Sequence, residues 1–146
     1  MDLTKGMPAK IHVETKITDP NGVEKFVFDE KGKVVQMGSS YYIRYEESVE
    51  GSDGIPVTFK VEPTGIVTLT RRGDVKTRLR FELGKSCETL YRLPQGSVYI
   101  DTVTNHLEIS YTDEPFTGHV QIQYALYYGK EKLGDYHLQL IFTICN

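Results

Sequence analysis

The sequence predicts an all-β fold, an antiparallel barrel of about 8–10 strands. Apolar and polar side chains alternate along most of the chain, and turn-forming residues lie between the alternating segments. No stretch of about ten residues or more has the 3.6-residue apolar period of a helix. A strict period of two indicates strands that bury one face and expose the other.

The alternating segments follow one another from near the N-terminus to the end of the chain. Their apolar positions are, in order, Ile11, Val13 and Ile17; Phe26 and Phe28; Tyr41, Ile43 and Tyr45; Val57, Phe59 and Val61; Val67 and Leu69; Leu79, Phe81 and Leu83; Leu107, Ile109 and Tyr111; Val120, Ile122, Tyr124 and Leu126; and Leu138, Leu140, Phe142 and Ile144. At most one short helical turn is expected, in the N-terminal leader or near Val49–Ile55.

Turn residues separate these segments and predict tight connections between consecutive strands. They are Asp19-Pro20-Asn21-Gly22, Glu30-Lys31-Gly32-Lys33, Glu62-Pro63-Thr64-Gly65, Arg72-Gly73-Asp74 and Leu93-Pro94-Gln95-Gly96. Proline lacks the N–H that a strand interior needs, and Pro63 and Pro94 both fall in these gaps.

One-sided antiparallel strands either stack as a sandwich or close as a barrel. Closure removes exposed strand edges, and the long terminal segments suit a meander that returns to its start. We therefore favour the barrel and predict that residues 1–146 form a single domain.

Composition argues against several classes of partner. The net charge of −3 gives no global basic field for nucleic acid or anionic lipid, and no apolar run has the length of a membrane span. Residues 1–7 lack the apolar core of a signal peptide, so we expect a cytoplasmic protein that binds neither nucleic acid nor membrane. Cys87 and Cys145 are isolated in the sequence and are expected as reduced thiols rather than as a disulfide.

Known catalytic motifs are absent, and no cofactor or metal is expected. The histidines all lie on the polar phase of their strands, where surface histidine is the default interpretation; they are His12, His106, His119 and His137. An enzyme would need clustered titratable groups in a cleft, which the strand phase does not show. We therefore expect a protein that is not an enzyme.

Two charged residues share the apolar phase of their strands. Extending Tyr41-Ile43-Tyr45 by one step places Glu47 on the buried face, and extending Val67-Leu69 places Arg71 there. A buried charge needs a partner, so an ion pair between Glu47 and Arg71 is predicted if the strand ends meet. Tyr91, Tyr111 and Tyr124 lie on or near the same phase.

Two interpretations of these inward polar residues stay open. They either form a satisfied cluster that plugs one barrel end, or they line a pocket in which Arg71 binds an anion and tyrosine hydroxyls orient it. On the outer phase, Arg44, Arg78 and Arg80 suggest a basic stripe, but Glu46 and Glu82 interrupt it. A solvated charged face is favoured there over a nucleic-acid surface.

Four segments, in their order and spacing, resemble the YwiB-like family of bacterial proteins. They are YYIRYEE over 41–47, VTLTRRG over 67–73, LRFELG over 79–84 and GHVQIQYAL over 118–126. The resemblance covers about Ile11 to Ile144 and implies a calycin barrel, the architecture of lipocalins. It also implies a Tyr-x-Glu element at Tyr45 and Glu47 and an Arg-x-Gly element at Arg71 and Gly73; Leu93-Pro94-Gln95-Gly96 departs from the family pattern.

The leading hypothesis is a barrel that binds a small molecule or peptide at one open end, through Tyr45, Glu47, Arg71, Tyr91, Tyr111 and Tyr124. The alternative is an interaction or scaffold module with a solid core, which pairs with a partner or forms a homodimer. Tyr42, Tyr99 and Tyr127 motivate the alternative because they lie on the polar phase, where interfaces use aromatic residues.

Overall fold

The computed structural model describes residues 2–48, 54–73 and 76–145. A short 3₁₀-helix, η1 (Leu3–Lys5), precedes the strands. The described strands are β1 (Met7–Asp19), β2 (Gly22–Met37), β3 (Ser40–Glu47), β4 (Ile55–Val61), β5 (Val67–Arg72), β6 (Lys76–Phe81), β7 (Ser86–Leu93), β8 (Gly96–Thr112), β9 (Thr117–Tyr128) and β10 (Glu131–Ile144). The all-β prediction is confirmed, and the helical turn in the leader is η1; residues 49–53 lie outside the described residues.

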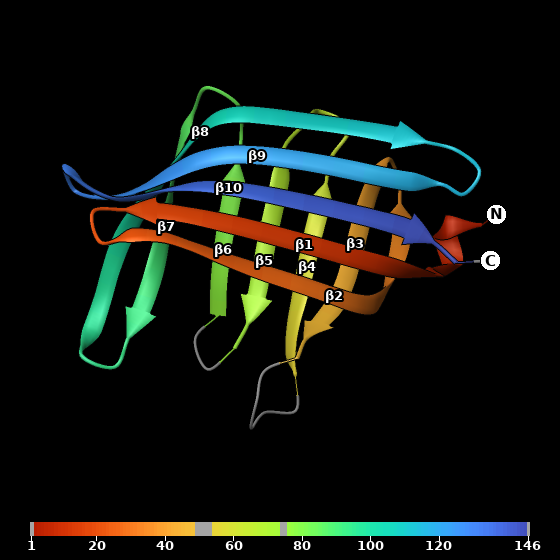
Figure 1. Cartoon of the computed structure of the whole chain (residues 1–146), viewed down its shortest axis with the longest axis horizontal. Helices are drawn as coiled ribbons and strands as arrows, with labels where there is room; N and C mark the ends of the chain where they lie inside the picture. The colour runs from red at the N-terminus through yellow and green to blue at the C-terminus, as the bar shows by residue number, and fades with distance from the viewer. Residues whose placement is uncertain (1, 49–53, 74–75, 146) are drawn as a thin grey trace.

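The described strands form one ten-stranded antiparallel sheet in the order β6-β5-β4-β3-β2-β1-β10-β9-β8-β7. The first and last strands are neighbours, with Ala9 opposite Ile144 and Thr18 opposite Asp135. The two ends of the chain therefore lie side by side (Figure 1). This pairing is the return of the meander to its start that the long terminal segments predicted.

The molecule has two layers of strands, and the bent strands β2 and β8 belong to both. Figure 1 shows β1, β9 and β10 crossing in front of β3–β6 at a steep angle. The strand β2 pairs with β1 from Gly22 to Val34, and it pairs with β3 only at its end, from Gly32 to Met37. Similarly, β8 pairs with β7 over its first half and with β9 over its second, with a register shift between Thr104 and His106.

The barrel is nearly closed, because β6 and β7 meet without forming a regular ladder. The Gly84 N–H donates to the Thr104 carbonyl at 3.0 Å, and the Thr104 N–H donates to the Lys85 carbonyl at 3.2 Å. The Thr89 hydroxyl donates to the Arg78 carbonyl at 2.8 Å. These bonds hold the two ends of the sheet together where the strand ladder stops.

The core occupies the space between the two layers and consists of the inward positions of the strands. Its largest fully buried side chains include Phe59, Phe81, Phe142, Ile11, Ile43, Ile122 and Leu140. Most inward positions predicted from alternation are indeed buried. Leu83 is an exception, since β6 ends at Phe81 and the Leu83 side chain is largely exposed.

One predicted turn is wrong. Glu30-Lys31-Gly32-Lys33 lies inside β2 rather than between two strands. A Cβ atom at Gly32 would overlap the Arg44 carbonyl oxygen and the Ile11 side chain. Glycine at this position therefore permits the close approach of β2 to β3 at the bend, and the chain does not reverse there. The connections at Asp19–Gly22, Glu62–Gly65 and Leu93–Gly96 are turns between strands as predicted, and Asp74 lies outside the described residues.

Alternation did not reveal β7 and the first half of β8, although the predicted turn at Leu93–Gly96 lies between them, because their inward faces carry few apolar side chains. Cys87 and Thr89 lie opposite Thr102 and Ile100, and the fully buried Thr102 and Thr104 continue that face. Threonine is a good strand residue but does not produce the apolar alternation that reveals a strand. The cysteines Cys87 and Cys145 are both free.

Within the part of the chain that the structure describes, no helix has the length and apolar character needed to cross a membrane.

Candidate functional site

The ion pair between Glu47 and Arg71 lies at the end of β3, on the inner face of the sheet. The Arg71 Nε–H donates to both carboxylate oxygens of Glu47 at 3.2 Å. The Glu47 side chain is only 10% exposed, whereas the Arg71 side chain is 41% exposed. The pair predicted from strand phase is therefore present, with the carboxylate buried and the guanidinium reaching toward solvent.

Within the described residues, the contacts of Arg71 occupy only part of its guanidinium. Glu47 takes the Nε–H, and no second acceptor among the described residues binds the terminal nitrogens. A guanidinium carries five N–H donors in a planar fork that matches a carboxylate or phosphate. Arg71 can therefore hold Glu47 and still present donors to a further anionic group.

Tyr45 and Glu30 lie beside this pair. Tyr45 is buried and its ring stacks on Phe59, with the ring centroids 6.4 Å apart. Burial, and after it the nearby Glu47 carboxylate, raises the pKa of Tyr45 well above its ordinary value, so its hydroxyl stays protonated. Glu30 Oε1 accepts a hydrogen bond from the Ser48 N–H at 3.3 Å, which ties β2 to the end of β3.

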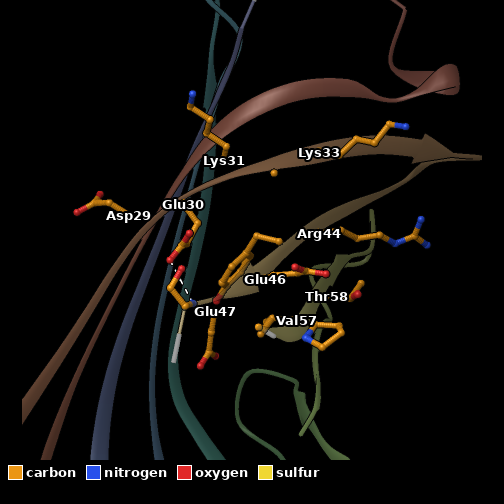
Figure 2. Close-up of a pocket in the computed structure, with 14 residues that line it drawn as sticks. Asp29, Glu30, Lys31, Lys33, Arg44, Glu46, Glu47, Val57 and Thr58 are labelled. Atoms are coloured by element: carbon orange, nitrogen blue, oxygen red, sulfur yellow. Dashed lines mark hydrogen bonds between the residues drawn. The ribbon is translucent and has the colours of Figure 1, made fainter. Parts of the chain in front are cut away.

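An open cleft of about 1040 Å³ lies where β2 and β3 splay apart, and Tyr45 and Glu47 line it. In Figure 2, Glu30 and Glu47 extend on one side of the cleft, and Lys33 and Arg44 extend on the other. Side chains of both charges thus surround one concavity next to the buried ion pair. The cleft could not be predicted from the sequence, because the predicted turn at Glu30–Lys33 interrupts β2 at Gly32, the residue at which the two strands separate.

The edge of β2 beside this site has one neighbour only among the described strands. From Gly22 to Lys31, β2 pairs with β1 and with no second strand. Phe26 and Phe28 face inward there, opposite Thr15 and Val13 on β1. Phe26 is nevertheless 45% exposed and Phe28 is half-buried, so the inner face is not covered at this edge.

Tyr91 and Tyr124 belong to a separate aromatic group around Tyr136. The ring of Tyr124 lies 4.9 Å from that of Tyr136 and 4.6 Å from that of Phe81, measured between centroids. Burial raises the pKa of Tyr124 and of Tyr91 above the usual value. These tyrosines face inward as predicted, but their described contacts are those of core packing.

Tyr111 lies near the opposite end of β3, against Tyr41. Its ring centroid is 5.3 Å from that of Tyr41 and 5.6 Å from that of Phe116. Burial, and after it the neighbouring Tyr41, raises the pKa of Tyr111 to about 12. The six predicted site residues therefore fall into three groups: Tyr45, Glu47 and Arg71 lie together at one end, Tyr91 and Tyr124 lie in the aromatic group of the core, and Tyr111 lies apart from both.

The described residues contain no group of three or more His, Cys, Asp or Glu side chains that could hold a metal ion. The histidines are half-buried rather than fully exposed. His12 Nδ1 lies 2.6 Å from an Asp29 oxygen, and His106 Nε2 lies 3.0 Å from a Glu108 oxygen. The His137 Nε2 is buried and has no partner among the described residues.

Comparison with known proteins identifies a fold relative and a family. The crystal structure of the YwiB protein from Bacillus subtilis superposes with a TM-score of 0.81 at 22% sequence identity, over 97% of this chain and 94% of that one. At this identity the likeness establishes the fold. Among curated proteins, none matches the sequence. Residues 11–140 match the domain of unknown function DUF1934, and the chain belongs to this family.

Proposed function

We propose that this protein is a calycin-like, lipocalin-like barrel that binds a small molecule or peptide at the end holding Glu47 and Arg71. The observation that carries the proposal is the exposure of inward-facing groups at this end. Arg71 and Phe26 both face inward, yet each is at least two-fifths exposed to solvent. An inner face that stays open to solvent has room for a ligand, whereas packed positions such as Phe59 do not.

The chemistry of this end fits an amphipathic anion. Arg71 offers the N–H donors that Glu47 leaves unused, and Glu47 fixes the direction of the guanidinium. Phe26 and Phe28 provide an apolar wall at the unpaired edge of β2. A ligand with a carboxylate, sulfonate or phosphate head and an apolar body would satisfy both features.

The first test is native mass spectrometry of protein purified gently from its own host. A reproducible bound mass supports the proposal and gives the chemical class of the ligand. A bare protein mass shifts the balance toward the alternative described below, because a tightly bound ligand would survive gentle purification.

A second test uses 8-anilinonaphthalene-1-sulfonate, a fluorescent amphipathic anion, as the probe. We expect Arg71→Met to weaken probe binding at least about tenfold, since hydrogen bonds to a charged group are worth roughly 1.5–3 kcal/mol. Arg72→Met is the matched control, because it removes the same charge from the next position of β5 on the outer face. Equal probe binding by the Arg71→Met variant and the wild type would rule out Arg71 as the residue that binds the anionic group.

The second candidate function is an interaction module, and one outward patch favours it. Leu90 on β7 and Tyr99 on β8 lie directly opposite each other. Leu90 is 38% exposed and Tyr99 is 58% exposed, whereas Tyr42 and Tyr127 are only half-buried. Self-association through this patch predicts a dimer that Tyr99→Glu dissociates. Sedimentation showing a monomer at every accessible concentration would eliminate the homodimer.

A further inference from the structure

The outer face of β3–β6 gathers basic side chains from strands that are separate in the sequence. Its cations, with Lys33 of the adjoining β2, are Lys33, Arg44, Lys60, Arg72, Lys76, Arg78 and Arg80. Among the described residues, the carboxylates on the same face are Glu46, Glu62 and Glu82. Cations thus clearly outnumber carboxylates on this surface, which we call the basic face.

The basic face is locally cationic although the whole chain carries a net charge of −3. The remainder of the chain must therefore be more acidic than the total suggests. Charges farther apart than the Debye length of about 10 Å at 0.1 M salt are largely screened. A polyanion docked on this face would consequently respond to the local cations more than to the net charge.

Strand pairing places these cations in rows with short hydroxyl side chains between them. Arg44 is opposite Thr58, Thr58 is opposite Thr70, and Thr70 is opposite Arg78. At about 4.8 Å between strands, this row spans roughly 14 Å. The next row runs from Tyr42 through Lys60 and Thr68 to Arg80.

In the part of the chain that the structure describes, few cations of this face are paired with a carboxylate. Of its cations, only Arg80 lies within ion-pair distance of a described carboxylate, 3.9 Å from Glu82. The Arg44 guanidinium and the Lys60 amine lie over the Tyr42 ring, 5.4 and 5.7 Å from its centroid. These contacts order the two side chains without pairing either charge with a described carboxylate.

We propose that the basic face binds the sugar-phosphate backbone of a nucleic acid. Arginine, lysine and threonine are among the side chains that proteins use for phosphate oxygens. This face presents arginine and lysine in adjacent rows, with the half-buried Thr58 and Thr70 between them, whereas Thr68 is buried. Because cations already cover the Tyr42 ring, the contact is with phosphates and does not require base stacking. The sequence prediction excluded nucleic acid on net charge and favoured a solvated charged face over the stripe of Arg44, Arg78 and Arg80. Strand pairing adds further cations to that stripe, namely Lys33, Lys60, Arg72 and Lys76.

The test is fluorescence anisotropy with a labelled oligonucleotide of about 20 residues at about 50 mM salt, a range in which phosphate contacts dominate. Arms with single-stranded RNA, single-stranded DNA and duplex DNA distinguish the source of the backbone. We expect the double variant Arg44→Ala/Arg78→Ala to bind the oligonucleotide at least tenfold more weakly than the wild-type protein does. It should also reduce the slope of log association constant against log salt by about 1.4, or 0.7 for each lost single-strand contact.

The matched control is Lys10→Ala/Lys16→Ala, which removes two exposed cations from the outer face of β1. It should keep binding within about twofold of the wild type. Because Arg44→Ala also removes a contact with Tyr42, circular dichroism checks folding, and Lys33→Ala/Arg80→Ala provides a second variant of the same face. Three results overturn the proposal: no binding at low salt, an equal loss in the control, or tighter binding to polyglutamate than to any oligonucleotide.

Discussion

Breaking the Glu47–Arg71 pair from either side should have unequal effects on stability. Arg71→Met leaves the Glu47 carboxylate buried without its hydrogen-bond donor, whereas Glu47→Gln leaves a guanidinium that water still reaches. Removing one partner of a fully buried pair costs about 3–5 kcal/mol. Since the Arg71 side chain is 41% exposed, solvent screening reduces this cost, and we expect about 2 kcal/mol for Arg71→Met.

Glu47→Gln should cost about 1 kcal/mol, because the amide oxygen can still accept from the Arg71 Nε–H. The double variant carries neither charge, so no charge is left buried without a partner. The two single costs in unfolding free energy should therefore not add. We expect the double variant to be no less stable than Arg71→Met alone, which corresponds to a coupling energy of about 1 kcal/mol.

The assay is urea unfolding of the wild type, both single variants and the double variant, analysed as a double-mutant cycle. Arg72→Met again serves as the control and should change the free energy of unfolding by less than about 0.5 kcal/mol. Strict additivity of the two substitutions would refute the reasoning, because it would mean that the two side chains do not stabilise each other. A cost for Arg71→Met no greater than that of Arg72→Met would refute it equally.

Three further predictions concern other parts of the barrel. Gly118→Ala should destabilise by about 1–3 kcal/mol, because the added Cβ would overlap the Phe142 ring; Phe142→Leu in the same chain should recover part of the loss, and two simply additive costs in urea unfolding would contradict this. Burial raises the pKa of Tyr111 to about 12 and raises those of Tyr45 and Tyr124, while an unfolded tyrosine ionises near pH 10, so stability should be complete below about pH 10 and fall as the pH rises through about 12. Urea midpoints measured from about pH 8 to 12 check this, and a constant midpoint would be inconsistent with it. Because Cys87 and Cys145 are free, dithiothreitol should leave the melting temperature unchanged, and a decrease would indicate a disulfide.

Alternation predicts the fold well wherever the inner face of a strand is apolar. The positions of β3, β4, β9 and β10 follow directly from it, because a period of two is the geometric signature of a one-sided strand. It fails for β7, where inward threonine replaces apolar residues, and at Gly32, where glycine within a strand resembles a turn. Both failures have the same origin, because alternation identifies an inward strand position only when the residue there has an apolar side chain.

The candidate site was predictable in part for a related reason. Strand phase placed Glu47 and Arg71 on the inner face, and a buried charge requires a partner, so their pairing could be inferred before any strand order was known. Phase assigns a face, however, and says nothing about position along the barrel. Tyr111 shares the inner phase of Tyr45 and nevertheless packs near the opposite end of β3, against Tyr41.

The basic face was predictable only in part, because the outer phase suggested the arginines of the stripe but not the further cations that strand pairing places beside them. Arg44 and Arg78 lie far apart in the chain, and they share a row only because β3, β4, β5 and β6 pair in that order and register. The same alternation that separates Arg71 from Arg72 places one arginine of β5 in the proposed ligand site and the other on the basic face. The two proposals therefore predict opposite effects for substitutions at these adjacent residues. Arg71→Met should impair the anionic dye and spare the oligonucleotide, and Arg72→Met should do the reverse; a substitution that impairs both would indicate a change in β5 itself rather than the loss of either site.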